Sequence, residues 1–371
     1  MDALEAITVR TASATYPVEV ASGAARHMAE RMAAVGLRPS RVAVICDVAV
    51  ESSTAAEVDR SLSAAGMAVA RIGMQATEDS KTLGTLGDLC ERMLADGIDR
   101  SGAVVAVGGG VVGDVAGFAA ATYMRGIPCV QVPTTLLAMV DAAVGGKTAV
   151  NLVRADGTLA KNMVGSFAQP RLVVCDPECL ATLPVRELRS GLAECVKHAV
   201  IADPAMLAWI RGRIDPILSR DPATLAQLVA RNVKIKAEVV GADEREDGRR
   251  AVLNLGHTFA HAIESLLHGE CTHGEAVAIG TVAACRLAGV LGHGAPDMES
   301  AVRETLAAIG LPAALPAARP AEELLSAMAS DKKKRGGALH LVVPFAFGDV
   351  RVLGDVPNDA VRAAWRAVGA G

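Results

Sequence analysis

The sequence contains few aromatic residues and has little net charge. Only 2% of its 371 residues are Phe, Trp or Tyr, so the chain has few side chains on which the bases of single-stranded nucleic acid could stack. The formal net charge of -4 provides no overall positive field to hold a polyanion. We therefore expect no nucleic-acid partner and a small anionic ligand at most.

Paired cysteines and long apolar runs are also absent. The eight cysteines are scattered without a CxxC pair, which argues against a zinc ribbon and a disulfide framework. Apolar stretches are interrupted before about 18 residues, and the first ten residues lack the basic and apolar regions of a signal peptide. These features predict a soluble cytoplasmic protein with no membrane partner.

The length and the patterning predict two domains. Dividing 371 residues by a typical domain size of about 150 suggests two, and 51% hydrophobic residues are enough to build both cores. Residues 1–182 alternate predicted strands (42–46, 68–72, 103–107 and 129–132) with helices (52–65 and 82–95), which indicates a Rossmann-like α/β domain with a parallel sheet. Residues 183–371 have long apolar-periodic segments, with helix starts at Asp203-Pro204 and Asp221-Pro222, and predict a mostly α-helical domain.

A glycine-rich loop follows the strand predicted at 103–107. Residues 108–113 have GxGxxG spacing and precede a predicted helix, an arrangement in which the backbone and the helix N-terminus can bind a diphosphate. The alternative is a tight turn in which glycine supplies a positive φ. The loop follows a late strand and no acidic residue stands about 20 positions on, unlike the usual dinucleotide fingerprint. Asp47 is a second candidate for the ribose, or simply a solvated carboxylate at a strand end.

Imidazole and carboxylate groups are concentrated in the helical half. His257, His261 and Glu264 have i, i+4 and i+7 spacing, so they share one helical face, and His273 and Glu275 open the next helix. Upstream, Glu194 and Lys197 lie one turn apart in an apolar segment. These oxygen and nitrogen donors, without thiolates, predict a catalytic Zn²⁺ or similar divalent ion. Spacing alone leaves the ligands open among Glu194, His257, His261, Glu264, His273 and Glu275.

Several cations stand in apolar or glycine-rich surroundings. Alone, each is most often a solvated charge, but together they suit a substrate that carries phosphate and carboxylate: Lys147, Lys161 beside Asn162, Lys236 and Arg250. Residues 145–148 match the end of a Walker A loop, but Asp141 occupies the position of its first glycine, which excludes a nucleoside triphosphate site. The charged run 331–335 is interpreted as a solvated loop.

Taken together, the motifs resemble one family closely. The matching segments, in chain order, are 108–118, 123–126, 133–141 with 146–148, 161–165, 191–197, 253–264, 273–277 and 331–333. With weaker similarity between them, they cover most of the chain and resemble the 3-dehydroquinate synthase family of the sugar-phosphate cyclase superfamily.

The resemblance implies an N-terminal NAD-binding domain, a C-terminal helical domain that binds metal and substrate, and an active site in the cleft between them. It implies a lyase of the shikimate pathway to aromatic amino acids, which converts 3-deoxy-D-arabino-heptulosonate 7-phosphate to 3-dehydroquinate and phosphate. NAD would remove a hydride from a substrate alcohol and return it after phosphate is eliminated, so it is not consumed. The ring would then open and close again by an aldol step.

The resemblance also implies residue roles. The metal, Zn²⁺ or Co²⁺, would be bound by Glu194, His257 and His273. The catalytic set would be Lys197, His261, Arg250, Asn254 and Asp141. The substrate would contact Lys147, Asn162, Lys236 and one of Lys332 and Lys333, with Arg125 supplied by the neighbouring subunit of a homodimer. The NAD set would be Asp47, Glu78, Lys81, Gly109, Gly110, Asp114, Thr134, Thr135, Lys147, Lys161 and Thr182.

The chain departs from the family pattern at three places, two of which are the small substitutions Ala49 (usually Asn) and Ala260 (usually Gly), and several alternative functions are open. Residues 151–160 form a longer segment than the family usually has before its Lys-Asn pair, here Lys161 and Asn162. An amino-dehydroquinate synthase, another sugar-phosphate cyclase, a metal-dependent polyol dehydrogenase and a non-catalytic NAD-binding homologue are the alternative functions.

Overall fold

The computed structural model describes residues 5–154, 159–267, 269–332 and 340–371, without the side chains of 330–332. The chain forms two compact units. Unit 1 comprises Met1–Leu183 and Arg220–Glu244, and unit 2 comprises Pro184–Ser219 and Arg245–Gly371. Each unit is described by itself below.

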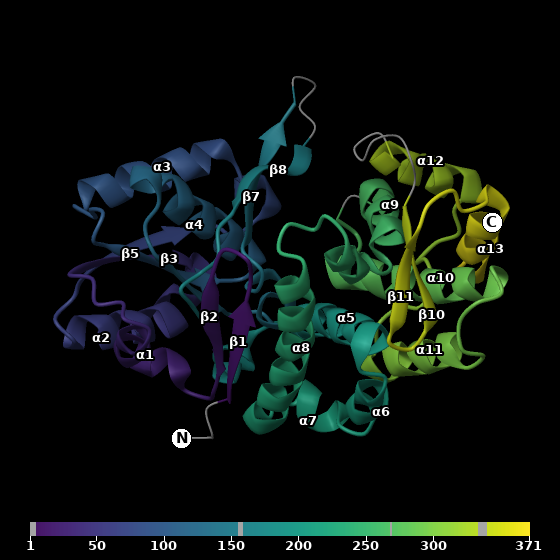
Figure 1. Cartoon of the computed structure of the whole chain (residues 1–371), viewed down its shortest axis with the longest axis horizontal. Helices are drawn as coiled ribbons and strands as arrows, with labels where there is room; N and C mark the ends of the chain where they lie inside the picture. The colour runs from purple at the N-terminus through teal and green to yellow at the C-terminus, as the bar shows by residue number, and fades with distance from the viewer. Residues whose placement is uncertain (1–4, 155–158, 268, 333–339) are drawn as a thin grey trace. The chain divides into compact units, whose positions relative to one another are not determined.

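Unit 1 is built on a seven-stranded sheet with the order β1-β2-β9-β6-β5-β3-β4. Strands β1, β2, β3 and β5 of this sheet are labelled in Figure 1. Apart from the antiparallel pair β1–β2, its strands run parallel, which confirms the predicted α/β class. The strands are β1 (Glu5–Arg10), β2 (Thr15–Val20), β3 (Arg41–Asp47), β4 (Ala68–Met74), β5 (Ala103–Gly108), β6 (Cys129–Pro133) and β9 (Leu172–Cys175).

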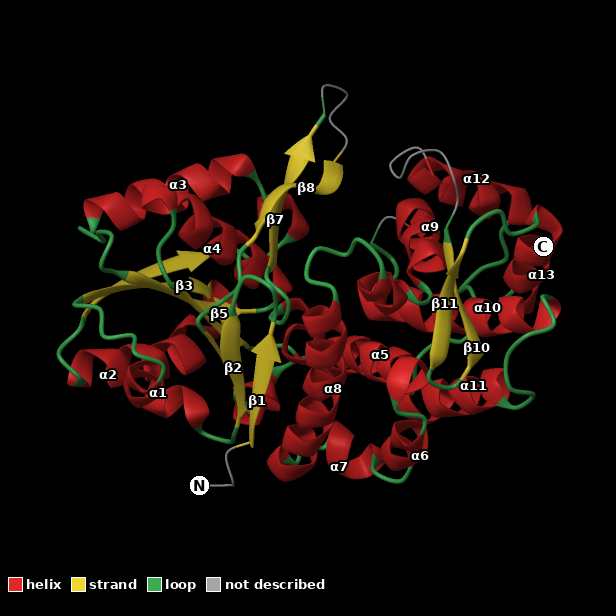
Figure 2. Cartoon of the chain, in the orientation of Figure 1, coloured by secondary structure: helices red, strands yellow, loops and turns green. Residues whose placement is uncertain are grey.

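Helices cover both faces of this sheet (Figure 2). Successive side chains of a strand point to opposite faces, so β3 contributes Val42 and Val44 to one core and Ala43 and Ile45 to the other. The first core includes α1 (Met28–Ala34) and α2 (Ala56–Ala64), and the second includes α3 (Leu83–Ala95) and α4 (Gly110–Thr122). Burial on both faces explains the nearly continuous apolar runs of the parallel strands.

Short helices and a hairpin complete the first part of unit 1. The short helices are η1 (Ala24–His27), η2 (Val48–Val50), η3 (Glu51–Ala55), η4 (Glu78–Ser80), η5 (Tyr123–Arg125), η6 (Ala138–Ala142) and η7 (Pro177–Thr182). Strands β7 (Lys147–Val153) and β8 (Leu159–Phe167) pair antiparallel as a separate two-stranded sheet. Residues 151–153 and 159–160 of the segment 151–160, which the sequence suggests to be a lengthened loop, therefore lie in these two strands.

Helix α8 (Pro222–Ala242) belongs to unit 1, although the sequence-based division placed all of 183–371 in one domain. The helix packs against β1, and a Cβ on Gly241 would lie 2.7 Å from the Arg10 carbonyl oxygen. Its start is the predicted one, because the Asp221 side chain accepts a hydrogen bond from the Thr224 amide and Pro222 follows it. The hydrophobic periodicity gives the helix but not the unit with which it packs.

Unit 2 is mostly helical, as predicted. Its helices are α5 (Val185–Ala202), α6 (Ala205–Arg211), α7 (Ile214–Leu218), η8 (Arg249–Asn254), α9 (His257–Leu267), α10 (His273–Val290), α11 (Met298–Ile309), α12 (Ala321–Lys332) and α13 (Asn358–Ala367). The hairpin of β10 (Leu341–Ala346) and β11 (Asp349–Leu353) was not predicted. Helix α6 begins after Pro204, so the proline and not Asp203 occupies its N-cap position.

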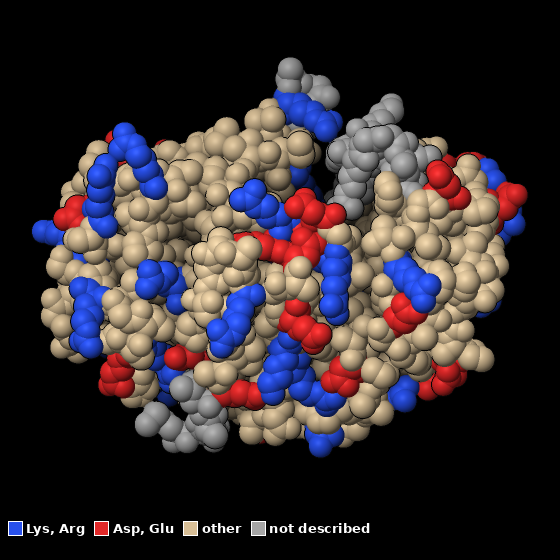
Figure 3. All heavy atoms as spheres, viewed as in Figure 1, with Lys and Arg blue, Asp and Glu red and all other residues tan. Residues whose placement is uncertain are grey.

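Two further observations concern the described residues. None of their helices has the length and hydropathy needed to cross a membrane. On the face shown in Figure 3, basic and acidic side chains are interspersed, in keeping with a net charge of only -4.

Candidate active site

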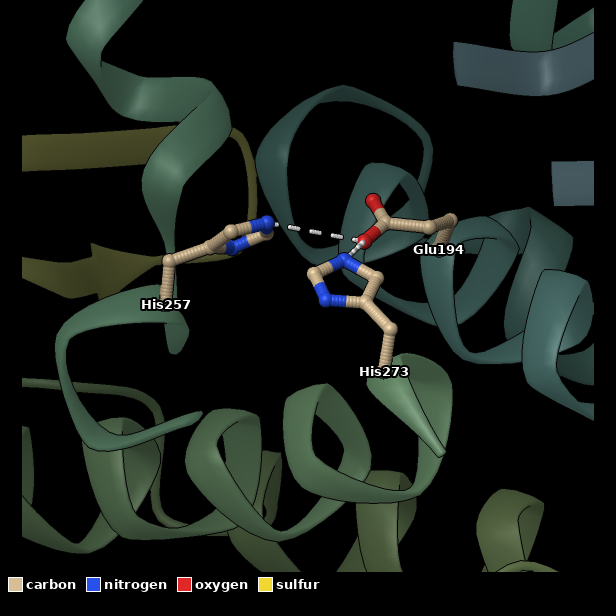
Figure 4. A group of neighbouring side chains, drawn as sticks. All are labelled: Glu194, His257 and His273. Carbon is tan, nitrogen blue, oxygen red and sulfur yellow. Dashed lines mark ion pairs between the residues drawn. The ribbon is translucent and has the colours of Figure 1, made fainter. Parts of the chain in front are cut away.

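Three predicted metal ligands meet in unit 2. Glu194 lies within α5, His257 is the first residue of α9, and His273 is the first residue of α10. One donor atom from each lies within 4.8 Å of the others, and Figure 4 shows both imidazoles turned toward the carboxylate. The His257 and His273 Nε2 atoms are 3.7 and 3.6 Å from Glu194 Oε1.

The other nitrogen of each imidazole has its own partner. His257 Nδ1 is 3.2 Å from the carbonyl oxygen of Leu255, and His273 Nδ1 is 3.3 Å from Glu264 Oε1. A proton on Nδ1 satisfies both contacts, so that Nε2 of each ring, once deprotonated, can donate its lone pair to a metal ion beside Glu194. Metal-binding histidines are typically oriented by such hydrogen bonds.

The structure separates the six candidates that spacing left open. Glu264 contacts His273 on the side away from Glu194. The exposed His261 has its ring centroid 5.9 Å from that of His257, edge to face. Glu275 pairs with Arg186 and forms a capping box with Thr272 at the start of α10. Glu194, His257 and His273 thus form the group, with Glu264 behind one of its members.

Close backbone contacts hold the three helices in place. A Cβ on Gly274 would lie 2.1 Å from the Ser190 carbonyl oxygen, and the Gly274 amide donates to Ser190 Oγ at 3.0 Å. A Cβ on Gly280 would lie 2.2 Å from the carbonyl oxygen of Gly256. Only glycine allows these approaches of α10 to α5 and to the start of α9. These glycine positions were not predicted from the sequence, although Gly274 adjoins His273 in the motif.

Charge in the group is balanced inside the protein. Glu194 and Lys197 form an ion pair one helical turn apart, and their side chains are 0% and 1% exposed. Burial, together with the Lys197 charge, lowers the pKa of His257 to about 3, so its ring is neutral. At His273 burial opposes protonation, but the bonds to Glu194 and Glu264 outweigh it and raise the pKa to about 10. A cation would take the place of that proton.

The donor set fits a divalent metal ion. One buried carboxylate and two imidazoles, without a thiolate, are typical of catalytic Zn²⁺ sites with three protein ligands, and imidazole also suits neighbouring transition metals. Two predicted catalytic residues also lie in this unit. Arg250 is buried in η8, and the side-chain Nδ2 of Asn254 donates a hydrogen bond to Glu246 Oε1.

Asp47 and the glycine loop, both predicted to bind a dinucleotide, lie at the carboxyl ends of two neighbouring strands of the unit 1 sheet. From β3 the chain continues to β4 on one side and then returns to β5 on the other, so the strand order reverses between β3 and β5. Ligands of open α/β sheets bind at the carboxyl ends of the strands beside such a reversal. Asp47 ends β3 and the glycine loop follows β5. This explains why the loop follows a late strand.

The glycines of the loop serve close approach and not backbone conformation. Gly108, Gly109 and Gly110 are not among the positive-φ residues, so the tight-turn interpretation is wrong. A Cβ on Gly108 would lie 2.6 Å from Val112 Cγ2, and one on Gly109 would lie 3.2 Å from Thr135 Cγ2. Gly109 is the N-cap of α4 and has no side chain to cap the helix. The first backbone amides of α4 are therefore not covered by a capping side chain.

Of the other predicted NAD residues, Thr134 and Thr135 follow β6, and the rest lie in or beside helices and in the β7–β8 hairpin. Asp47 accepts a hydrogen bond from the Ala49 amide at 3.0 Å, and the Thr134 amide donates to the Gly108 carbonyl at 2.9 Å. Thr135 follows Thr134, and Thr182 ends η7. Lys81, 3% exposed, pairs with Asp114. Burial raises the pKa of Asp114, and Lys81 counteracts that shift. Glu78 begins η4, close to Lys81 in the chain.

The predicted substrate residues of unit 1, together with Lys161 of the predicted NAD set, lie on separate elements. Lys236, on α8, pairs with Asp141, in η6. Lys147 is exposed at the start of β7, and Lys161 and Asn162 lie exposed in β8. Arg125 is exposed and has a positive φ of 69°. In unit 2, Lys333 and the side chain of Lys332 lie outside the described residues.

Models of one protein family match most of the chain. Residues 71–190 match the 3-dehydroquinate synthase N-terminal model, and residues 191–334 match the 3-dehydroquinate synthase C-terminal model. The chain belongs to the 3-dehydroquinate synthase family. A curated 3-dehydroquinate synthase from Caulobacter vibrioides is 43% identical over 366 residues, covering 97% of this chain and 98% of the relative. These matches confirm the resemblance and indicate a phosphate-eliminating lyase.

Solved structures of the same superfamily share the fold. A 2-epi-5-epi-valiolone synthase from Streptomyces hygroscopicus subsp. jinggangensis 5008, with NAD⁺ and Zn²⁺ bound, has a TM-score of 0.85 at 28% identity and covers 99% of this chain and 98% of its own. A 2-deoxy-scyllo-inosose synthase complexed with carbaglucose-6-phosphate, NAD⁺ and Co²⁺ has a TM-score of 0.88 at 26% identity, covering 98% of this chain and 100% of its own. The fold class is thereby confirmed.

Proposed function

We propose that this chain converts 3-deoxy-D-arabino-heptulosonate 7-phosphate to 3-dehydroquinate and phosphate, with NAD and a divalent metal as cofactors. Unit 1 binds NAD at the β3–β5 strand ends, and unit 2 binds Zn²⁺ or Co²⁺ through Glu194, His257 and His273. The observation that carries the proposal is this Glu-His-His group in a chain 43% identical to curated 3-dehydroquinate synthases over nearly its full length.

A bound metal would supply polarisation of the substrate alcohol, and bound NAD would supply a reversible acceptor for its hydride. Lys197 neutralises the buried Glu194 carboxylate and donates a hydrogen bond to the substrate. Arg250 and Asn254 bind substrate oxygens in unit 2. His261, beside His257, holds and releases a proton during phosphate elimination. Lys332 or Lys333 adds a further contact to the substrate.

In unit 1, fixed charges orient the ligands. Lys236 holds the Asp141 side chain, so that this carboxylate faces the nicotinamide and substrate in one arrangement. Lys147 and Asn162 bind substrate oxygens, and Lys147 and Lys161 contact NAD. Lys81 and Asp114, with Asp47, Glu78, Gly109, Gly110, Thr134, Thr135 and Thr182, complete the dinucleotide site.

The direct test supplies the purified protein with NAD⁺, Zn²⁺ and the heptulosonate phosphate. We expect release of inorganic phosphate coupled to formation of dehydroquinate. Parallel reactions with the amino-substituted substrate, other sugar phosphates and a simple polyol separate the alternative functions. Turnover of a polyol without phosphate release would overturn the proposal.

Lys197→Ala tests the division between metal binding and catalysis. Because Lys197 is paired with Glu194 but is not itself a ligand, the variant should lose turnover while retaining stoichiometric metal, measured by elemental analysis. Loss of the metal would show that Lys197 supports the metal site instead of the substrate.

We further propose a cytoplasmic homodimer in which Arg125 contacts the substrate phosphate of the neighbouring subunit. The exposed position of Arg125 suits this role, and eight free cysteines suit a reducing compartment. Mixing Arg125→Ala with Lys197→Ala subunits tests the shared site. Each variant alone should be inactive, whereas each mixed dimer should contain one intact site. Absence of recovered activity, with subunit exchange verified by mass spectrometry, would contradict the shared site.

A further inference from the structure

Asn151 occupies a central position among the ligand-binding residues proposed for unit 1. Its side chain is buried, with 1% of the residue exposed. Asn151 Nδ2 donates to the Glu78 carbonyl oxygen at 3.1 Å and to Glu78 Oε2 at 3.0 Å. Asn151 Oδ1 accepts a hydrogen bond from the Asn162 amide at 2.9 Å. Both ends of this one amide are thus used, and each reaches a different segment of the chain.

The backbone around Asn151 is irregular in a way that suits these contacts. In the β7–β8 hairpin, Val150 pairs with Val164 and Leu152 with Ala160, so Asn151 opposes an enlarged segment that contains Asn162. The backbone amide of Asn151, which is not paired within the hairpin, donates instead to the Lys81 carbonyl oxygen at 2.7 Å. Bulges of this kind redirect side chains and are common beside active sites.

The segment opposite Asn151 contains a residue in an uncommon conformation. Asn162 has a φ of 57°, in the left-handed region that asparagine adopts more readily than most other residues. Its side-chain oxygen accepts a hydrogen bond from Lys81, which also pairs with Asp114 of α4. Asn151 therefore fixes the backbone of Asn162 while Lys81 fixes its side chain.

We propose that Asn151 is a positioning residue, which joins η4 to the β7–β8 hairpin so that Glu78, Lys81 and Asn162 are aligned for NAD and substrate. This inference rests on the proposed function for the identity of the ligands. The contact itself, in which the side-chain amide of Asn151 holds the segment around Asn162, does not depend on that function. Asn151 does not itself contact substrate in this proposal.

Asn151→Asp is the decisive variant. It keeps the size of the side chain and the Oδ1 acceptor, but it replaces the amide donor with a carboxylate oxygen beside Glu78. Loss of a hydrogen bond to a charged partner and the new repulsion should raise the Kd for NAD⁺ and the KM for substrate about 10- to 100-fold. The change in KM should exceed the change in kcat, because the reacting groups are untouched. In the ligand-free protein, amide hydrogen exchange of residues 159–167 should become faster.

Asn232→Asp is the matched control. Asn232 is also a buried asparagine of unit 1, and its Nδ2 donates within α8 to the Leu228 carbonyl at 2.8 Å. This variant should lower the melting temperature but leave the Kd for NAD⁺ and the exchange of 159–167 unchanged. Equal changes in the two variants would reduce Asn151 to a general stabilising residue and overturn the inference.

A second variant tests the contact directly. Adding Glu78→Gln to Asn151→Asp restores a donor and acceptor pair across the same contact, so exchange of 159–167 should return toward that of the parent. If Asn151→Asp does not fold, Asn151→Ser provides the same comparison of binding and exchange. If removal of the Asn151 side-chain amide left the Kd for NAD⁺, the KM for substrate and the hydrogen exchange of 159–167 unchanged, the inference would be overturned. The proposed function would remain intact. An inactive parent would refute the proposed function, while the exchange data would still decide the role of Asn151.

Discussion

The metal-ligand group of unit 2 and the strand-end site of unit 1 are built in different ways. The metal group uses side chains from three helices, and its position depends on backbones in near contact at Gly274 and Gly280. The strand-end site is made where the order of parallel strands reverses, from the residues that follow each strand. Helix packing thus creates one site and sheet topology creates the other.

This difference predicts which substitutions will alter each site. In unit 2 a buried charge or an added methyl group between helices changes the ligand geometry directly, because Glu194 is fully buried and the helices that carry the ligands are in close contact. In unit 1 the sheet is stabilised by two cores on its opposite faces, and the loops at its edge can change without disturbing either. Variants of the metal group should therefore affect stability and function together, whereas variants of the strand ends should affect mainly binding.

The largest expected effect is that of Glu194→Gln. The substitution removes the charged ligand and leaves the Lys197 ammonium buried without its counter-charge, and breaking such a pair costs about 3–5 kcal/mol. Metal content should fall to background, with turnover lost and the free energy of urea unfolding reduced. Glu264→Gln is the control, because it affects only the orientation of His273 and should weaken metal affinity about 10- to 100-fold. Full metal occupancy in Glu194→Gln would remove Glu194 from the ligand set.

Gly274→Ala tests whether helix contact controls the metal group. The added Cβ would lie 2.1 Å from the Ser190 carbonyl oxygen, so α10 must move, at a cost of about 3 kcal/mol in the free energy of unfolding. Metal affinity should fall as well. Gly289→Ala, in the same helix with open space around its Cβ, should be neutral or stabilise by up to about 1 kcal/mol. Similar behaviour of the two variants would disprove the close-contact explanation.

Metal removal should distinguish the two units. Adding Zn²⁺ to chelator-treated protein at about 100 times its Kd should stabilise the native state by about 2.7 kcal/mol. Hydrogen exchange should slow in α9 and α10, whereas β3 and β5 should change little. Glu194→Gln, which lacks a ligand, should show no such response. A response centred on β3 and β5 would place the metal elsewhere.

The smallest expected effect is that of Gly109→Ala. Its Cβ would lie 3.2 Å from Thr135 Cγ2, a tight contact that the loop can relieve by a small shift. The shift should raise the Kd for NAD⁺ about tenfold, equivalent to about 1.4 kcal/mol, while metal content stays unchanged. Gly87→Ala, on α3 with open space around its Cβ, is the control for helix effects. Equal NAD⁺ affinity in parent and Gly109→Ala would show that the loop tolerates a side chain at this position.

Local patterns predicted much of the fold. Apolar runs located β3, β4, β5 and β6, and the Asp221-Pro222 pair located the start of α8, because burial and capping act over a few residues. The β7–β8 hairpin was missed because its irregular pairing does not give a simple alternation of apolar and polar residues. The packing of α8 with unit 1 was missed because a hydrophobic stripe does not specify its partner.

The sequence by itself determined which chemistry was available: oxygen and imidazole donors without paired thiolates, a glycine loop between a strand and a helix, and cations enough for a doubly anionic substrate. Helical spacing placed His257, His261 and Glu264 on one face, but only the tertiary structure brought Glu194, His257 and His273 together and left Glu264 behind His273. It also decided that the glycine loop lies at the reversal of strand order and that Asn151 joins η4 to the hairpin. The physical reason is range: propensity and periodicity act between neighbours in the chain, whereas these contacts join distant segments through packing.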